Sequence, residues 1–121
     1  LVIHPGGSVY FTDPKYVGPE KMELESFDVY RLDPKGTLAR LETGVSKPNG
    51  IILSQDARTI FIAETDNGTA EAESNPDAVR GRMTLNAFRL GKDGIPGRKR
   101  VIVNFGDQLG IDGMTMDTAE P

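Results

Sequence analysis

The sequence contains no cysteine and no tryptophan, and its only histidine is His4. Without cysteine the chain has no disulfide framework, no thiol nucleophile and no thiolate metal site. A Gly-x-Ser-x-Gly motif is also absent, so a serine-hydrolase triad that would use His4 is not indicated. We therefore interpret His4, which stands before Pro5 and two glycines, as a structural turn residue.

Long apolar runs and an excess of positive charge are missing as well. No stretch approaches the roughly 18 apolar residues that a membrane-spanning helix needs. Lys and Arg total 14 against 18 acidic residues, which gives a net charge of −4. This balance provides no electrostatic footprint for nucleic acid or an anionic membrane, and we expect neither as a partner.

Short alternating runs rich in Val, Ile, Tyr and Phe, separated by glycine and proline, predict an all-β chain without helices. The clearest predicted strands are Ser8–Thr12, Asp28–Leu32, Thr37–Leu41, Ile51–Ser54, Thr59–Ala63, Leu85–Leu90 and Arg100–Phe105. Hairpin turns are predicted at Gly6-Gly7, Asp33-Pro34-Lys35-Gly36, Gln55-Asp56-Ala57 and Lys92-Asp93-Gly94.

These strands form an internal repeat. Residues 2–13 align with 52–64, residues 28–32 align with 86–90, and a third copy begins at Gly113. Each unit reads as four antiparallel strands repeated every 50–60 residues or so, the pattern of a β-propeller blade. A β-sandwich has similar strand spacing, but it does not require the copies to match in sequence.

We therefore predict one partial β-propeller domain over residues 1–121, built of four-stranded antiparallel blades. The blade units run over residues 1–50 and 51–112, and a third starts at residue 113. The chain opens within a strand at Leu1, without an initiator methionine, and its last residues stop where a turn and a partner strand should follow. Propellers need about four to eight blades to close. We thus expect an internal piece of a longer protein, whose remainder is needed to close the site.

The repeat places two oxygen-bearing residues at equivalent positions. Asn49-Gly50 and Asp112-Gly113 each precede an apolar strand and stand 63 residues apart (112 − 49). The first strand of a propeller blade lines the central channel, so equivalent residues at its start form a ring around the axis. An amide oxygen and a carboxylate are hard ligands that suit Ca²⁺ or Mg²⁺. Taken singly, Asn-Gly and Asp-Gly are also common turn dipeptides.

A family resemblance rests on four segments: Val9–Pro14, Val29–Gly36, Lys47–Ile51 and Gly110–Met114. Together they are similar to the gluconolactonase, luciferin-regenerating-enzyme and senescence-marker-protein family. The similarity runs nearly end to end and is weakest across residues 69–80. The resemblance implies a six-bladed propeller with one divalent ion on its axis, which hydrolyses sugar lactones and some phosphotriesters.

By this resemblance, Asn49 and Asp112 match the family's metal-binding Asn and Asp, and Asp112 also matches its proton-transfer residue. The expected cofactor is one divalent cation, Ca²⁺ first, with Zn²⁺, Mg²⁺ or Mn²⁺ as alternatives. The family's metal-binding Glu and its Asn-Asp or Asn-Gly substrate motif have no counterpart in these residues and would lie before Leu1. We expect the 121 residues alone to be inactive.

Asp13 and Glu64 are second candidates, for binding the substrate. They stand at equivalent ends of second strands, and in an antiparallel hairpin that end lies beside the start of the first strand. Both residues are therefore expected at the same mouth as Asn49, where they can hydrogen-bond sugar hydroxyls. The alternative is that they are solvated loop carboxylates.

Two classes of function follow. In the first, the parent protein is a metal-dependent lactonase: the ion polarises the lactone carbonyl and Asp112 transfers the proton. A phosphotriesterase is the nearest enzymatic alternative, because the same ion can polarise a P=O bond. In the second class, the propeller is a non-catalytic interaction module with a structural ion.

Overall fold

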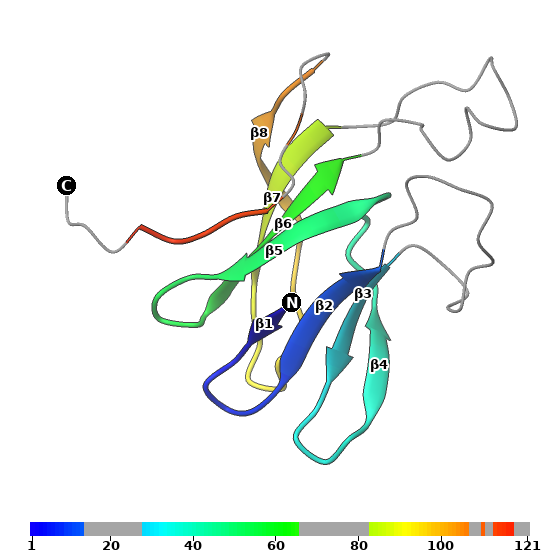
Figure 1. Ribbon diagram of the computed structural model, residues 1–121, viewed down its shortest axis with the longest axis vertical. Helices are drawn as coiled ribbons and strands as arrows, with labels where there is room; N and C mark the ends of the chain where they lie inside the picture. The colour runs from blue at the N-terminus through cyan, green and yellow to red at the C-terminus, as the bar shows by residue number, and fades with distance from the viewer. Residues whose placement is uncertain (14–27, 66–82, 107–109, 111–112, 118–121) are drawn as a thin grey trace, which may run out of the picture.

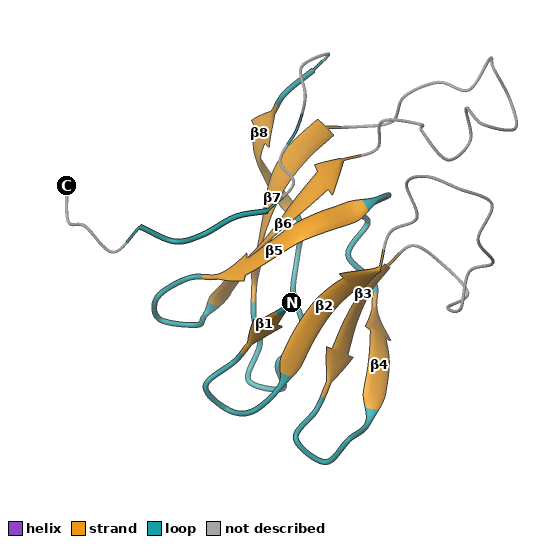
Figure 2. Cartoon of the chain, viewed as in Figure 1, coloured by secondary structure: helices purple, strands orange, loops and turns teal. Residues whose placement is uncertain are grey.

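The computed structural model describes residues 1–13, 28–65, 83–106, 110 and 113–117. This part of the chain contains strands and no helix, and therefore no helix that could span a membrane (Figure 2). The eight strands are β1 (Val2–Ile3), β2 (Val9–Asp13), β3 (Asp28–Leu32), β4 (Leu38–Leu41), β5 (Pro48–Leu53), β6 (Thr59–Thr65), β7 (Met83–Arg89) and β8 (Arg100–Asn104). The all-β prediction is confirmed.

The strands form two antiparallel sheets, each of four strands in chain order. The first sheet runs β1-β2-β3-β4 and the second runs β5-β6-β7-β8 (Figure 1). Every neighbouring pair is antiparallel, and no strand crosses from one sheet to the other. Sandwiches of the immunoglobulin kind exchange strands between their sheets. Two consecutive four-stranded meanders are instead the arrangement of consecutive propeller blades.

The four hairpin turns share one geometry. In each, a backbone N–H donates to the carbonyl three residues earlier: Gly7 to His4, Gly36 to Asp33, Ala57 to Ser54 and Gly94 to Gly91. The donor residue has a positive φ in all four turns, and Ala57, at 58°, is the only one that is not glycine. The turns predicted from the sequence are confirmed, and they repeat because the blade repeats.

His4 has the structural role that its position predicted. Its Nδ1 accepts a hydrogen bond from the Gly6 N–H at 2.9 Å, so in the neutral ring Nε2 carries the proton. Nε2 then donates to the Ala57 carbonyl at 3.2 Å, which links the first turn of one sheet to the first turn of the other.

The two sheets share a single core. The first strands of the two sheets are neighbours in space: β5 lies against β1 and β2, and β4 and β8 lie on the far sides (Figure 1). The buried core residues come from both sheets and from the connection between them: Tyr10, Val29, Leu41, Val45, Ile51, Ile60, Ile62 and Phe88. The Tyr10 hydroxyl adds a hydrogen bond across the interface, to the Gly94 carbonyl at 2.6 Å.

The start of β5 differs from the prediction. We expected this strand to begin at Ile51, but it begins at Pro48, so the division predicted between residues 50 and 51 falls inside a strand. Proline and glycine in a strand usually signal a turn or a bulge. Here they signal a bulge and not a turn, because the pairing of β5 with β6 shifts between Pro48 and Ile51. Asn49 therefore lies within the strand and not ahead of it.

We predict opposite effects of glycine and alanine exchanges at two matched turn positions. Gly36→Ala should lower the free energy of unfolding by about 1 kcal/mol, because φ is +90° and no atom lies within 4 Å of the added Cβ, so only backbone strain acts. Ala57→Gly should raise it by about 0.5 kcal/mol, because relief of roughly 1–2 kcal/mol of left-handed strain exceeds the added chain entropy of about 0.4–1 kcal/mol. Urea unfolding measures both, and shifts of the same sign would contradict this account.

Candidate functional site

Asn49 lies on a β-bulge near the beginning of β5. Pro48 pairs with Glu64 and Ile51 pairs with Ile62, so three steps along β5 match only two along β6. Bulges of this kind occur next to functional sites, where they redirect a side chain. Asn49 is half-buried and Gly50 is buried. Both residues belong to β5, the strand that lies against β1 and β2 of the neighbouring sheet.

The backbone of Asn49 is fixed while its side chain is not engaged. The Thr12 hydroxyl, from β2 of the other sheet, donates to the Asn49 carbonyl at 2.7 Å. Within the part of the chain that the structure describes, the Asn49 carboxamide makes no hydrogen bond. Its oxygen is thus open to an external partner, and an amide oxygen is a ligand that hard cations accept. The role of Asn49 as a metal ligand stays a prediction.

Glu64 occupies a different environment from the one expected. Its side chain is fully buried. One carboxylate oxygen accepts from the Ser46 N–H at 2.7 Å, and the other accepts from the Thr84 hydroxyl at 2.9 Å. It is not a solvated loop carboxylate, and neither oxygen is open to a sugar hydroxyl in this arrangement. The carboxylate instead holds the segment that leads into β5.

The buried face of the second sheet becomes more polar toward Asn49. Three pairs of facing residues from β6 and β7 follow one another along this face: Ile60 with Phe88, Ile62 with Asn86, and Glu64 with Thr84. Asn86 is fully buried, and its amide nitrogen donates to the Thr84 hydroxyl at 2.9 Å and to the Ile62 carbonyl at 3.2 Å. Its amide oxygen has no partner in the described structure. Buried polar groups cost stability unless they are satisfied, so the burial of Glu64, Thr84 and Asn86 depends on the hydrogen bonds made at this end of the sheet.

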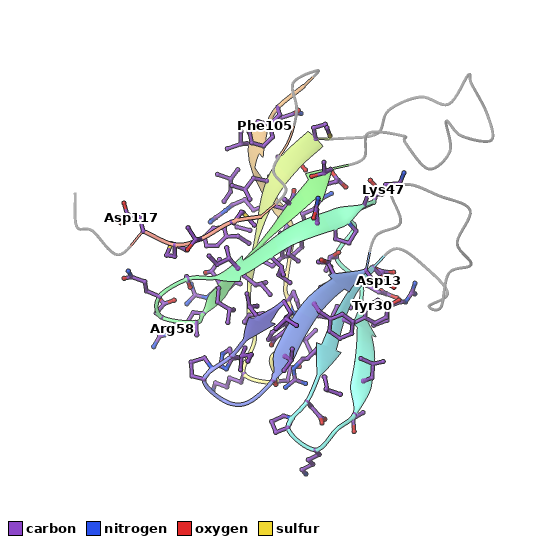
Figure 3. All side chains as sticks on the ribbon, in the orientation of Figure 1. Asp13, Tyr30, Lys47, Arg58, Phe105 and Asp117 are labelled. Carbon is purple, nitrogen blue, oxygen red and sulfur yellow. The ribbon has the colours of Figure 1, made fainter. Side chains whose placement is uncertain are left out.

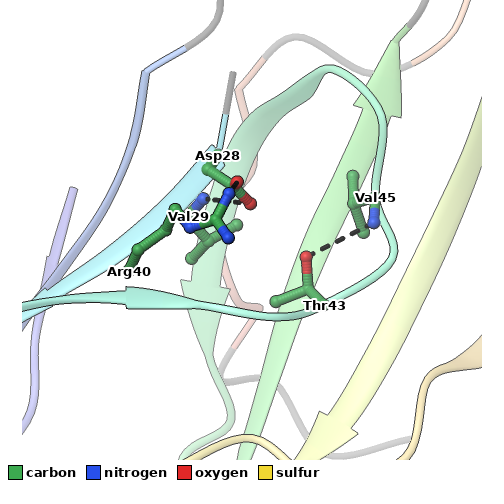
Figure 4. A network of polar contacts seen from close by, with 5 residues as sticks. All are labelled: Asp28, Val29, Arg40, Thr43 and Val45. Carbon is green, nitrogen blue, oxygen red and sulfur yellow. Dashed lines mark hydrogen bonds and ion pairs between the residues drawn. The ribbon is translucent and has the colours of Figure 1, made fainter. Parts of the chain in front are cut away.

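Asp13 is exposed at the end of β2, opposite Asp28. The Asp28 carboxylate is bonded to Arg40 at 3.0 Å (Figure 4). Asp13 and Lys47 lie at one end of the sheets and Arg58 at the other, which places Asp13 at the same end as Asn49 (Figure 3). Its exposure leaves it able to meet a ligand, so its role in substrate binding stays a prediction.

The connection between the sheets is ordered by its own polar contact. Thr43 accepts a hydrogen bond on its hydroxyl oxygen from the Val45 N–H at 3.3 Å (Figure 4). Val45 enters the core, and Lys47 is also buried. The segment thus reaches β5 along a defined path, which fixes where Asn49 stands.

The groups with shifted pKa values lie away from this end. A backbone hydrogen bond from Thr37 is the main cause that lowers the pKa of Asp33, and the Ser54 hydroxyl is the main cause that lowers the pKa of Asp56. Both are in hairpin turns at the opposite end of their sheets. A surface hollow lined by Arg89, Lys99 and other basic residues also lies away from Asn49. These features stabilise or border the turns and do not identify the site.

Asp112 lies outside the described residues, so its placement beside Asn49 stays a prediction. Among the residues that the structure does describe, no three His, Cys, Asp or Glu side chains gather in a group that could hold a metal ion.

Comparison with known proteins identifies the fold and the family. The family model described as "SMP-30/Gluconolactonase/LRE-like region" matches residues 1–120. The chain belongs to this family. The resemblance found in the four sequence segments is thereby confirmed.

Two relatives of this chain are named as lactone-hydrolysing enzymes. A gluconolactonase from Zymomonas mobilis subsp. mobilis is 28% identical over 110 residues, which cover 87% of this chain and 27% of that protein. The lactonohydrolase oryL of Aspergillus oryzae is 27% identical over 112 residues, covering 84% of this chain and 26% of that protein. The chain thus spans about a quarter of the length of these relatives.

Solved structures of gluconolactonase-family propellers match the two sheets. A gluconolactonase from Xanthomonas campestris superposes with a TM-score of 0.65 at 27% identity, over 92% of this chain and 34% of its own. Another solved structure, 24% identical, shows the same fold with a TM-score of 0.63 over 93% of this chain and 35% of its own. The propeller prediction is confirmed: the sheets are gluconolactonase-type blades.

Sequence reasoning missed Thr12, Thr84 and Asn86. Asn86 carried a usable signal, because asparagine is depleted in strands and here it stands in the middle of an apolar one. Thr12 carried none, since threonine is an ordinary strand residue and its partner belongs to the next blade.

We predict that the Thr84 hydroxyl is essential to the buried network. Thr84→Val keeps the shape but removes the hydrogen bond to the Glu64 carboxylate, and should cost about 2–3 kcal/mol of stability. Thr84→Ser keeps the hydroxyl and should cost about 1 kcal/mol for the lost methyl group. Chemical denaturation of the two variants checks this, and a Thr84→Val protein as stable as the parent would show that the hydroxyl contributes nothing.

Proposed function

We propose that the protein to which this chain belongs hydrolyses a sugar lactone, with one divalent cation held by Asn49 and Asp112. The family match supports lactone hydrolysis as the class of reaction. The observation that carries the site is Asn49 itself: a bulged residue on β5, the strand that lies against the neighbouring sheet. Its carbonyl accepts from Thr12, and its carboxamide makes no hydrogen bond among the described residues.

The two side chains favour a hard cation. An amide oxygen and a carboxylate are donors for Ca²⁺, and Mg²⁺, Mn²⁺ or Zn²⁺ are the alternatives. When bound, such an ion polarises the lactone carbonyl and makes it more electrophilic. Asn49, being neutral, contributes an oxygen without adding to the negative charge of the site.

Asp112 is the residue that we propose to move the proton. Its carboxylate accepts a proton from the water that attacks the lactone carbonyl carbon, and the new C–O bond gives a tetrahedral adduct. The bond between that carbon and the ring oxygen then breaks, and Asp112 returns the proton to the departing alkoxide. The product is an open-chain hydroxy acid, and no organic cofactor or redox partner is needed.

Asp112→Asn tests this function. The variant retains an oxygen ligand but loses the basic group, so turnover of an aldonolactone panel at saturating Ca²⁺ should fall by about 10²–10⁴-fold. Asp93→Asn, in an exposed hairpin turn, is the matched control and should leave turnover unchanged. The assay uses the whole protein, with Ca²⁺ affinity measured separately by calorimetry.

The outcomes separate the candidate functions. Turnover by Asp112→Asn within a fewfold of the parent would make Asp112 a ligand only and contradict its proton-transfer role. A parent that binds Ca²⁺ but hydrolyses no lactone would refute the lactonase proposal. Hydrolysis of a phosphotriester in place of lactones would point to the related phosphotriesterase chemistry.

A further inference from the structure

The bulge that carries Asn49 receives a hydrogen bond from the other blade. Thr12 stands on β2, and its hydroxyl donates to the Asn49 carbonyl at 2.7 Å. A bulge disrupts the regular ladder, so its peptide groups need partners from elsewhere. Thr12 supplies that partner from a residue 37 positions earlier in the chain.

The segment before the bulge is held independently by the second sheet. Glu64 binds the Ser46 N–H at 2.7 Å, and the Thr65 N–H donates to the Lys47 carbonyl at 3.0 Å. After the bulge, Ile51 is buried in the shared core. Residues on both sides of Asn49 are therefore fixed to β6 and to the core.

Between these two anchors, the Thr12 hydroxyl contacts the backbone of Asn49 itself. Rotation of the peptide between Asn49 and Gly50 changes ψ of Asn49 and φ of Gly50. Gly50 permits such rotation, because glycine has few steric restrictions. A hydrogen bond to the Asn49 carbonyl opposes this rotation and so holds the backbone from which the Asn49 side chain projects.

We propose that Thr12 is a positioning residue for Asn49. Through Thr12, the first blade sets the backbone geometry of a metal-ligating residue on the second blade. The inference rests on the proposed function, in which Asn49 binds the cation. Thr12 acts through the Asn49 carbonyl and does not touch the ion or the substrate. Because this bond joins β2 to β5, a change in how the two blades pack would also change the position of the Asn49 peptide.

Three variants of the whole protein test the proposal. Thr12→Val removes the hydroxyl at nearly constant volume, and Thr12→Ser retains it. Thr59→Val is the matched control: Thr59 lies at the other end of β6, and among the described residues its hydroxyl makes no hydrogen bond. Ca²⁺ affinity, measured by calorimetry, should fall about 10–100-fold in Thr12→Val, as is typical when a partner that orients a metal ligand is lost. It should stay near the parent value in Thr12→Ser and Thr59→Val.

A second readout is independent of the metal. In the ion-free protein, NMR relaxation of the Gly50 backbone amide, which belongs to the same peptide group as the Asn49 carbonyl, should show one ordered conformation in the parent and in Thr12→Ser, and increased motion in Thr12→Val. Unchanged order of this amide in Thr12→Val would overturn the inference. If the parent binds no divalent cation but Thr12→Val still frees the amide, the proposed metal site fails and the positioning by Thr12 stands. Affinity losses of equal size in Thr12→Val and Thr59→Val would show only a general loss of stability, and would also overturn it.

Discussion

The packing of β5 against β1 and β2 is the constraint on which the rest of this structure depends. In isolation, each four-stranded blade would expose an apolar face to water. Tyr10 from one sheet and Ile60, Ile62 and Phe88 from the other bury those faces against each other. At about 1.5–3 kcal/mol for each large apolar side chain removed from water, this core outweighs any single polar contact in the molecule.

The shared core also explains why the polar groups lie where they do. Along the buried face of β6 and β7, Ile60 and Phe88 form an apolar pair toward the turn end, and Ile62 faces Asn86 in the middle. Glu64 and Thr84 occupy the end nearest Asn49. A buried carboxylate is tolerable only with its hydrogen bonds made. Glu64 meets that requirement by binding Ser46 and Thr84, and in doing so it fixes the chain that leads into the candidate site.

Most of the fold could be predicted from the sequence, because the blade is encoded locally. Alternating apolar residues and turn glycines gave β3 with both its ends correct and placed all four hairpin turns. The beginning of β5 could not be predicted in this way, since Pro48 and Gly50 indicate a break where the strand continues through a bulge. Local patterns also could not show that Glu64 is buried, because its partners come from a connecting loop and from β7. The proposal of Asn49 as a site residue came from the repeat, whereas the role proposed for Thr12 depends on a contact between blades.

In the function proposed above, Asn49 and Asp112 hold one cation where the inner strands of the blades meet. A crystal structure of the whole protein grown with Ca²⁺ tests it most directly. The account predicts a single ion with the Asn49 amide oxygen and an Asp112 carboxylate oxygen both at about 2.3–2.6 Å. Side-chain oxygens of Asn49 and Asp112 that lie more than about 8 Å apart in the closed propeller could not share an ion, and would contradict it.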